Sequence, residues 1–187
     1  MSRVSQAQAQ ENRKNLVAAA SRLFREQGVA NLRVADLMRS LNMTHGGFYS
    51  QFASKDSLRT EATAHGFATL LDQLAGFDEA AGEHGAAQRA LVEYYLSPEH
   101  RDDPGEGCPT AGFVGDLARE QAQPETRQAY EEGVRSFADW LSAEDVDGLA
   151  RICTLVGAIL LARATAGSPL SEEVLDRARA SVLDEVD

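Results

Sequence analysis

The stretch from residue 34 to residue 49, VADLMRSLNMTHGGFY, constrains the fold most, because it specifies two short helices joined by a tight turn. Its first half carries the apolar face of an amphipathic helix at Val34, Leu37, Met38 and Leu41. Asn42 follows where that helix must stop, and Asn tolerates a left-handed backbone better than any residue except Gly. Thr44 stands at the N-cap of the next helix. The pattern predicts a helix-turn-helix.

The second helix, about His45 to Gln51, is a weak helix by propensity. Its adjacent glycines, Gly46 and Gly47, each cost about 1 kcal/mol relative to Ala. In a recognition helix such residues let the backbone approach DNA, while His45 and Tyr49 supply hydrogen-bonding groups beside them. The alternative is that the glycines form only a loop, since isolated helix-turn-helix patterns give many false positives.

The flanking residues favour the helix-turn-helix. Upstream, a helix over about residues 8–27 carries one apolar face at Leu16, Ala19, Ala20, Leu23 and Phe24. Gly28 closes it as a C-cap. Downstream, Ser54 is an N-cap that opens a long amphipathic helix reaching about Leu74.

The run from Leu23 to Leu58, LFREQGVANLRVADLMRSLNMTHGGFYSQFASKDSL, resembles the TetR family of transcriptional repressors. The matching positions are Gly28, Val34, Asp36, Gly46, Tyr49, Phe52 and Lys55. The resemblance covers about a third of the chain, and the remainder agrees in length and helical character. It implies an all-α protein of about nine helices, with a helix-turn-helix DNA-binding domain at 1–53 and a helical ligand-binding and dimerisation domain at 54–187.

The resemblance also implies which residues meet DNA. We expect contacts to operator DNA from Arg33, Thr44, His45, Gly46, Gly47, Tyr49 and Lys55. Three positions depart from the family pattern. Arg33 stands where a Ser or Thr cap is usual, Asn42 replaces a common turn Gly, and Gln51 stands where His is frequent. These departures affect the phosphate contacts rather than the fold.

A net charge of −11 argues against nucleic acid until its distribution is considered. Up to Thr60, nine Lys and Arg oppose four Asp and Glu, which gives +5, and the rest of the chain carries −16. A basic head on an acidic body suits DNA binding, because only the head needs to meet phosphate. The acidic body also serves solubility, which explains most of that charge.

The length of 187 residues allows one sizeable core or two small cooperating domains. No apolar run approaches the roughly 18 residues of a membrane span. The first ten residues, MSRVSQAQAQ, lack the apolar centre of a signal peptide, so we expect a cytoplasmic protein with a frayed N-terminus. Arg3 is read as part of a solvated tail, with a minor-groove arm as the alternative.

Downstream of the long helix, periodicity predicts helices over about residues 86–96, 109–122, 125–141, 142–166 and 168–183. The fourth begins with a proposed capping box of Ser142 and Asp145. The acidic segment 97–107 has no apolar anchor and reads as a mobile loop. His100, Asp102 and Asp103 in it lack the spacing of a metal site.

The family resemblance implies an apolar ligand cavity in the body. Candidate wall residues are Phe67, Leu71, Tyr95, Phe113, Leu117, Tyr130, Phe137 and Trp140. Aromatic residues at helical spacing can equally be plain core. The last two helices resemble the pair that forms a four-helix bundle between two subunits, with Ile152, Val156, Ile159, Leu160, Leu175, Ala178 and Val182 as candidate dimerisation residues. Packing onto the chain's own body is the alternative.

Cys108 precedes Pro109, a favoured first helical residue, and so lies near a helix N-terminus. Partial positive charge there favours the reactive thiolate, which suits a redox or electrophile sensor. The chain resembles a TetR branch with a Gly-Cys pair here, some members of which sense electrophiles. The alternative is a small, partly buried residue that fills a turn. A structural disulfide to Cys153 is improbable in a cytoplasmic chain.

No Ser-His-Asp arrangement, phosphate-cradling loop or metal-ligand cluster suggests an enzyme, a metal or a cofactor. We therefore expect a TetR-like transcriptional regulator that binds a palindromic operator as a homodimer and acts as a repressor. A small molecule or an electrophile or redox signal would release it. A helical partner-binding protein that has lost DNA binding is the rival interpretation. The sequence leaves the effector, the operator and the regulated genes open.

Overall fold

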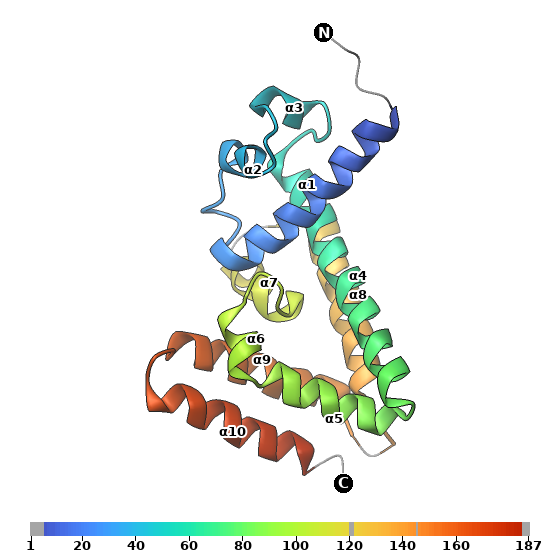
Figure 1. Ribbon diagram of the computed structural model, residues 1–187, viewed down its shortest axis with the longest axis vertical. Coiled ribbons are helices and arrows are strands. Elements are labelled where there is room, and N and C mark those ends of the chain that lie inside the picture. Colours follow the sequence, from blue (N-terminus) through green and yellow to red (C-terminus); the bar gives the residue numbers. More distant parts are fainter. Residues whose placement is uncertain (1–5, 120–121, 145, 185–187) are drawn as a thin grey trace.

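The computed structural model describes residues 6–119, 122–144 and 146–184, and in these residues the chain is helical, with ten α-helices (Figure 1). They are α1 Gln6–Gln27, α2 Val34–Ser40, α3 His45–Tyr49, α4 Lys55–Ala81, α5 His84–Tyr95, α6 Pro98–Asp102, α7 Pro109–Arg119, α8 Pro124–Leu141, α9 Gly148–Ala164 and α10 Pro169–Leu183. The all-α fold class predicted from sequence is confirmed.

Helix ends in the N-terminal part follow the chemistry that the sequence predicts. Gly28 has φ of +80° and its amide closes α1 on the Phe24 carbonyl at 2.9 Å. Asn42 takes φ of +55° between α2 and α3, as expected of Asn in this turn. Ser54 caps α4 in a reciprocal capping box with Ser57.

The first three helices form a head with its own core, joined to the start of α4. The buried core residues of this head cluster are Leu16, Ala20, Phe24, Val29, Leu32, Leu37, Met38, Phe48, Phe52, Leu58, Ala62, Phe113 and Leu117. Two of them, Phe113 and Leu117, come from α7 far along the chain. The head is therefore completed by a helix of the body.

Helix α4 leaves the head and runs down one side of the body beside α8, while α5, α9 and α10 lie across the far end (Figure 1). The contact between α4 and α8 is close, because a Cβ on Gly133 would lie 2.1 Å from the Phe67 ring. No side chain fits at Gly133 without displacing that ring. Helix α1 begins at one end of the molecule, and α10 lies at the other end (Figure 1).

Three expectations for the body were wrong in their boundaries. Helix α4 continues to Ala81, because Gly76 inside a long packed helix costs less than the packing gains. Segment 97–107 contains the short helix α6, capped by Ser97, and is anchored by the buried His100. Helix α9 begins at Gly148 with Asp147 as its N-cap, whereas Ser142 ends α8.

Two expectations fall outside the described residues, namely the N-terminal tail with Arg3 and the capping role of Asp145. Among the helices that the structure describes, none combines the length and the apolar character needed to cross a bilayer.

Candidate nucleic-acid interface and ligand cavity

Helix α3 presents an exposed edge at one end of the molecule. Tyr49 is 62% exposed, and Thr44, His45 and Gly46 are also exposed. Phe48 is fully buried and holds the helix to the head by stacking on Phe52, with ring centroids 5.8 Å apart. The predicted contact residues of α3 therefore share one accessible surface, with Gly47 half-buried beside them.

The glycine at position 46 is not required by the packing of the head. A Cβ there would meet no atom within 4 Å. A Cβ at Gly47 would make only ordinary contacts, the nearest at 3.5 Å to Met38 and Thr44. Intramolecular crowding therefore does not explain Gly46, and the missing side chain leaves its backbone open to close approach by another molecule.

Thr44 occupies the N-cap of α3 with an extended backbone, but its hydroxyl makes no capping hydrogen bond, so that part of the prediction was wrong. Arg33 likewise does not cap α2. Its Nε donates to Asp36 Oδ2 at 2.6 Å, and Asp36 also accepts from Arg39 at 2.8 Å. The pKa of Asp36 is lowered, chiefly by its hydrogen bond from Arg33.

Arg33 and Arg39 keep about three quarters or more of their side chains exposed, at 79% and 77%. One carboxylate thus holds two exposed guanidinium groups next to the predicted recognition helix. Arg39 was not among the residues predicted from the sequence to contact DNA. Its spacing of three residues from Asp36 on a helix could have revealed the pairing.

Lys55 is half-buried, and its ammonium group donates to the Val29 carbonyl in the loop between α1 and α2. Arg13 has a similar structural position. Its guanidinium lies 4.0 Å from the Phe52 ring centroid and donates to the Gln51 carbonyl. Arg13 thus fixes the segment that follows α3 to α1, and Lys55 fixes the start of α4 to the loop between α1 and α2, so Lys55 supports the head whether or not it also meets phosphate.

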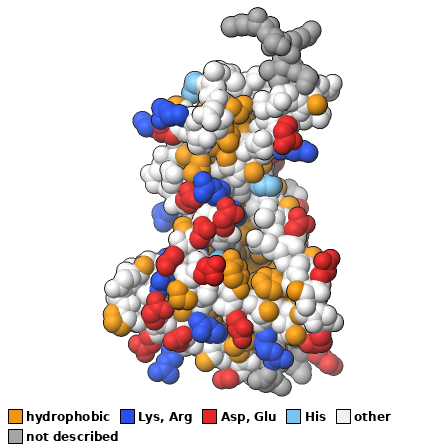
Figure 2. All heavy atoms as spheres, viewed as in Figure 1, with side chains coloured by type: hydrophobic (Ala, Val, Ile, Leu, Met, Phe, Trp, Pro, Cys, Tyr) orange, Lys and Arg blue, Asp and Glu red, His pale blue; other side chains and the backbone are white. Residues whose placement is uncertain are grey.

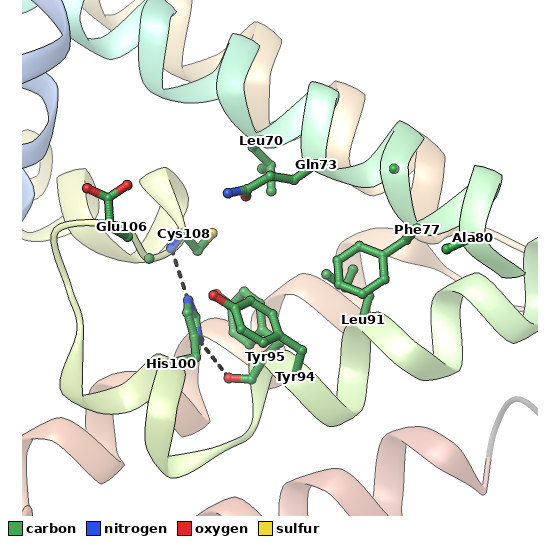
Figure 3. Close-up of a pocket in the computed structure, with 12 residues that line it drawn as sticks. Leu70, Gln73, Phe77, Ala80, Leu91, Tyr94, Tyr95, His100, Glu106 and Cys108 are labelled. Atoms are coloured by element: carbon green, nitrogen blue, oxygen red, sulfur yellow. Dashed lines mark hydrogen bonds between the residues drawn. The ribbon is translucent and has the colours of Figure 1, made fainter.

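A cavity of about 380 Å³ opens in the body between α4, α5, α6 and the loop that leads into α7. Figure 2 shows a recess bordered by hydrophobic side chains in this part of the molecule. Its wall residues are Leu70, Gln73, Gly76, Phe77, Ala80, Leu91, Tyr94, Tyr95, His100, Glu106, Gly107 and Cys108. The wall is largely apolar, with a few polar groups gathered at the α7 end (Figure 3).

Only Tyr95 of the eight predicted wall residues lines this cavity. Phe67 and Phe137 lie in the body core, whereas Phe113 and Leu117 lie in the head core. Of the others, Leu71 is exposed, Tyr130 borders smaller surface pockets and Trp140 donates its indole N–H to Asp78 at 2.7 Å. The aromatic residues on α8 mostly pack as core, the alternative that their spacing also allowed.

Cys108 borders the cavity at the start of α7 and is 4% exposed. Its carbonyl accepts the hydrogen bond of Gly112 N at 3.0 Å, which places it at the helix N-terminus as predicted. Its sulfur points into the cavity on the side of Gln73 (Figure 3). Cys108 and Cys153 are both free thiols, and Cys153 is exposed on α9.

His100 fixes the position of Cys108. The Cys108 amide donates to His100 Nε2 at 3.1 Å, and His100 Nδ1 lies 2.7 Å from the Tyr95 carbonyl. Because Nε2 accepts, the neutral ring carries its proton on Nδ1 and donates it to that carbonyl. Burial lowers the pKa of His100 to about 4, so the ring stays neutral at physiological pH.

Two tyrosine hydroxyls near the thiol are also buried. Burial raises the pKa of Tyr95 well above its ordinary value, and the neighbouring Cys108 thiol raises it further. The Tyr130 hydroxyl donates to the Thr110 carbonyl at 2.9 Å. Both side chains therefore remain protonated hydrogen-bond donors around the first turn of α7.

The predicted dimerisation residues divide between two environments. Ile152, Ile159, Leu175 and Val182 are buried in the chain's own core, where α9 packs on α10. Val156 and Ala178 are half-buried. Leu160 is 37% exposed, and the exposed face of α9 also carries Leu149 and Leu161 at 50% and 59%. The outward residues of this face are Leu149, Ala150, Cys153, Thr154, Leu160, Leu161 and Ala164, none of them charged.

The segment that builds the head resembles a known family of regulators. Residues 16–62 match the family model described as bacterial regulatory proteins, tetR family. This segment of the chain is a TetR-type DNA-binding domain. The chain is 33% identical over 61 residues to the HTH-type transcriptional regulator AcrR of Shigella flexneri. That match covers 33% of this chain and 28% of AcrR, so it spans less than a third of the curated relative's length.

Solved structures extend the likeness to the whole fold of the chain. The reduced form of E. coli NemR aligns with a TM-score of 0.77 at 20% identity, over 93% of this chain and 96% of NemR. A TetR-family transcriptional regulator from Cytophaga hutchinsonii aligns with a TM-score of 0.76 at 18% identity, over 98% of each chain. The matched family, AcrR and the Cytophaga protein are regulatory proteins rather than enzymes, in agreement with the sequence-based exclusion of an enzyme.

Proposed function

We propose that this protein is a TetR-type transcriptional repressor that binds a palindromic operator with α3. The observation that carries the proposal is the exposed edge of α3, where Gly46 has no intramolecular reason to be glycine. In the complex, His45, Gly46 and Gly47 lie against the base edges. Tyr49, Lys55, Arg33 and Thr44 meet phosphates, with the exposed Arg39 next to them.

The operator-binding form is proposed to be a homodimer. The support is the outer face of α9, which exposes three leucines, Leu149, Leu160 and Leu161, without a charged residue among its exposed positions. An exposed apolar face of this kind is unfavourable in water and favours a partner of the same chemistry. Two heads spaced about one DNA turn, roughly 34–36 Å, would bind a palindrome far more tightly than one head.

The signal is proposed to act in the cavity of the body. An apolar small molecule fits its volume and wall. The buried thiol of Cys108, directed into the same cavity, supports an electrophile or redox signal as the second form of this response. NemR, one of the structural neighbours, was solved in a reduced form, which adds support for redox control.

Fluorescence anisotropy tests the DNA-binding part. Purified protein is titrated onto labelled DNA from upstream of its own gene over a salt series, with fragments selected from genomic DNA if that one is not bound. Tight binding that weakens steeply with salt is the expected result. Failure to bind any selected fragment would favour the alternative, a helical partner-binding protein that has lost DNA affinity. The departures from the family pattern at Arg33 and Gln51 would then explain the loss.

The same assay tests the signal with N-ethylmaleimide as the thiol probe. Release of DNA by the wild type, retained binding by Cys108→Ser and release by Cys153→Ser would assign the response to Cys108. Binding that is indifferent to the probe in all three proteins would limit the signal to noncovalent ligands of the cavity.

Analytical ultracentrifugation tests the dimer. Leu161→Glu places a charge on the proposed interface and is expected to give a monomer. Leu71→Glu is the matched control, because Leu71 is also an exposed leucine, at 40%, but lies on α4 away from α9. A dimer that persists in Leu161→Glu, or that is lost equally in Leu71→Glu, would place the interface elsewhere.

A further inference from the structure

Helix α7 belongs to both cores of the molecule. At its start, Cys108 and Ala111 pack in the body core, and farther along Phe113 and Leu117 pack in the head core. The helix contacts α1 of the head as well as α4, α8 and α9 of the body. A rigid helix that is fixed in two cores transmits displacement from one to the other.

Asp116 lies where α7 meets the head. Its side chain is buried, and Oδ2 accepts a hydrogen bond of 2.7 Å from the Val29 backbone amide, at the start of the loop that leads to α2. Hydrogen bonds to a carboxylate are shorter and stronger than those between neutral groups. A buried carboxylate that lost this donor would keep only the more distant Arg119, whose Nη2 lies 3.8 Å from Oδ1, so its desolvation cost favours retention of the bond when α7 shifts.

The loop is shaped to receive this carboxylate. Gly28 has φ of +80°, and a Cβ there would lie 3.4 Å from Asp116 Oδ1. On the other side of Val29, its carbonyl accepts from the ammonium group of Lys55 in the first turn of α4. The peptide groups of Val29 are therefore held by α7 through the amide and by α4 through the carbonyl.

We propose that Asp116 is a positioning residue that couples the cavity to the DNA-binding head. Cys108 borders the cavity, and Asp116 lies eight residues farther along the same helix, about 12 Å away at the helical rise. A ligand or adduct that displaces the first turn of α7 moves the Asp116 carboxylate, and with it Val29 and the entry to α2. The inference rests on the proposed function, because it gives the route by which the signal reaches the operator-binding surface.

Amide hydrogen exchange of the ¹⁵N-labelled protein, followed by NMR, tests the local part of the proposal. In Asp116→Asn and Asp116→Glu, the Val29 amide is expected to exchange about tenfold faster or more, because the first loses the charge and the second displaces it. Asp139→Asn, on the exposed face of α8, is the matched control and should leave Val29 unchanged. An unchanged Val29 amide in both Asp116 variants overturns the proposal.

A double-mutant cycle separates coupling from plain stability. Cys108→Leu adds volume to the cavity wall at the start of α7 and should change Val29 exchange about fivefold or more in the wild type, but less than about twofold in Asp116→Asn. Operator affinity should show the same pattern. Equal effects of Cys108→Leu in both backgrounds would mean that Asp116 carries no coupling. If no variant binds DNA, the proposed function fails, while the exchange data still decide whether α7 and Val29 are coupled.

Discussion

The head and the body of this protein use their residues in different ways. The head builds its candidate surface from a contiguous segment, residues 33–55, whose functional side chains are exposed except for the half-buried Lys55. The body builds its cavity from α4, α5, the α6 segment and the start of α7, which are brought together only by the fold (Figure 3). The head therefore carries function on a surface, whereas the body carries it in the space between packed helices.

Charge follows the same division. The head is net basic and the body strongly acidic in sequence, and Figure 2 shows acidic side chains spread over the lower part of the visible face. An acidic body repels phosphate, so the charge distribution favours approach of DNA to the basic end. The two regions meet along α4, which runs from the head into the body, and at α7, which packs in both cores.

The largest effect is expected from removing the aromatic anchor of the head. Phe48→Ala should lower the free energy of unfolding by about 3–5 kcal/mol and abolish operator binding, because Phe48 is fully buried against Phe52. Urea unfolding followed by circular dichroism measures the loss. Phe137→Ala, at an equally buried position in the body, is the matched variant. If Phe48→Ala also abolishes the dimer, the two regions are not separable.

The next largest effect is expected in the body, where His100 makes the stability of the fold depend on pH. His100 has a pKa of about 4 in the folded protein, below the ordinary value of 6.5, because it is buried. The unfolded chain therefore takes up the proton first as the pH falls. The contribution of neutral His100 to the free energy of unfolding is fully present above pH 6.5. It falls by about 1.4 kcal/mol per pH unit down to about pH 4, roughly 3 kcal/mol in all.

His100→Gln should remove that pH dependence, since the glutamine amide can accept from Cys108 and donate to the Tyr95 carbonyl without titrating. Thermal or urea unfolding between pH 4 and pH 7 measures it. His65→Gln, at an exposed histidine of α4, is the control and should keep the wild-type profile. An unchanged profile in His100→Gln would show that this histidine is not the group that destabilises the fold in acid.

These two sites also show why the sequence predicted the head better than the body. Gly28, Asn42 and Ser54 act within a few residues of themselves, so local backbone chemistry revealed them. His100 acts on the amide of Cys108 and on the carbonyl of Tyr95 through a turn that periodicity does not describe. Its acidic surroundings made it resemble a solvated residue.

The cavity wall was missed for a related reason. Hydrophobic periodicity identifies which residues turn away from water, but it does not tell a packed residue from one that borders a space. Phe77 and Tyr94 were not among the predicted wall residues. In the structure Phe77 is half-buried and Tyr94 is partly exposed, as expected of residues at the rim of a cavity. The residues with the strongest pattern, such as Phe137, became core.

A smaller effect is expected at the surface of α3. Tyr49→Ala should weaken operator binding about tenfold, or about 1.4 kcal/mol, with little change in unfolding, because the side chain is 62% exposed and is proposed to donate to a phosphate. Anisotropy titration measures it. Tyr94→Ala, at a 40% exposed tyrosine of the cavity rim, is the control for losing an exposed ring. Equal weakening by both variants would contradict a direct role for Tyr49.

The smallest expected change in stability makes the sharpest test of the surface. Gly46→Ala adds a methyl group that meets no atom within 4 Å, so the isolated protein should become more stable by up to about 1 kcal/mol. If the glycine serves close approach to DNA, the same methyl group should weaken operator binding. Gly76→Ala is the control, because its Cβ also meets nothing but lies in the body. Gain of stability with unchanged or tighter DNA binding would leave Gly46 without a role at the interface and would move base recognition to other residues of α3.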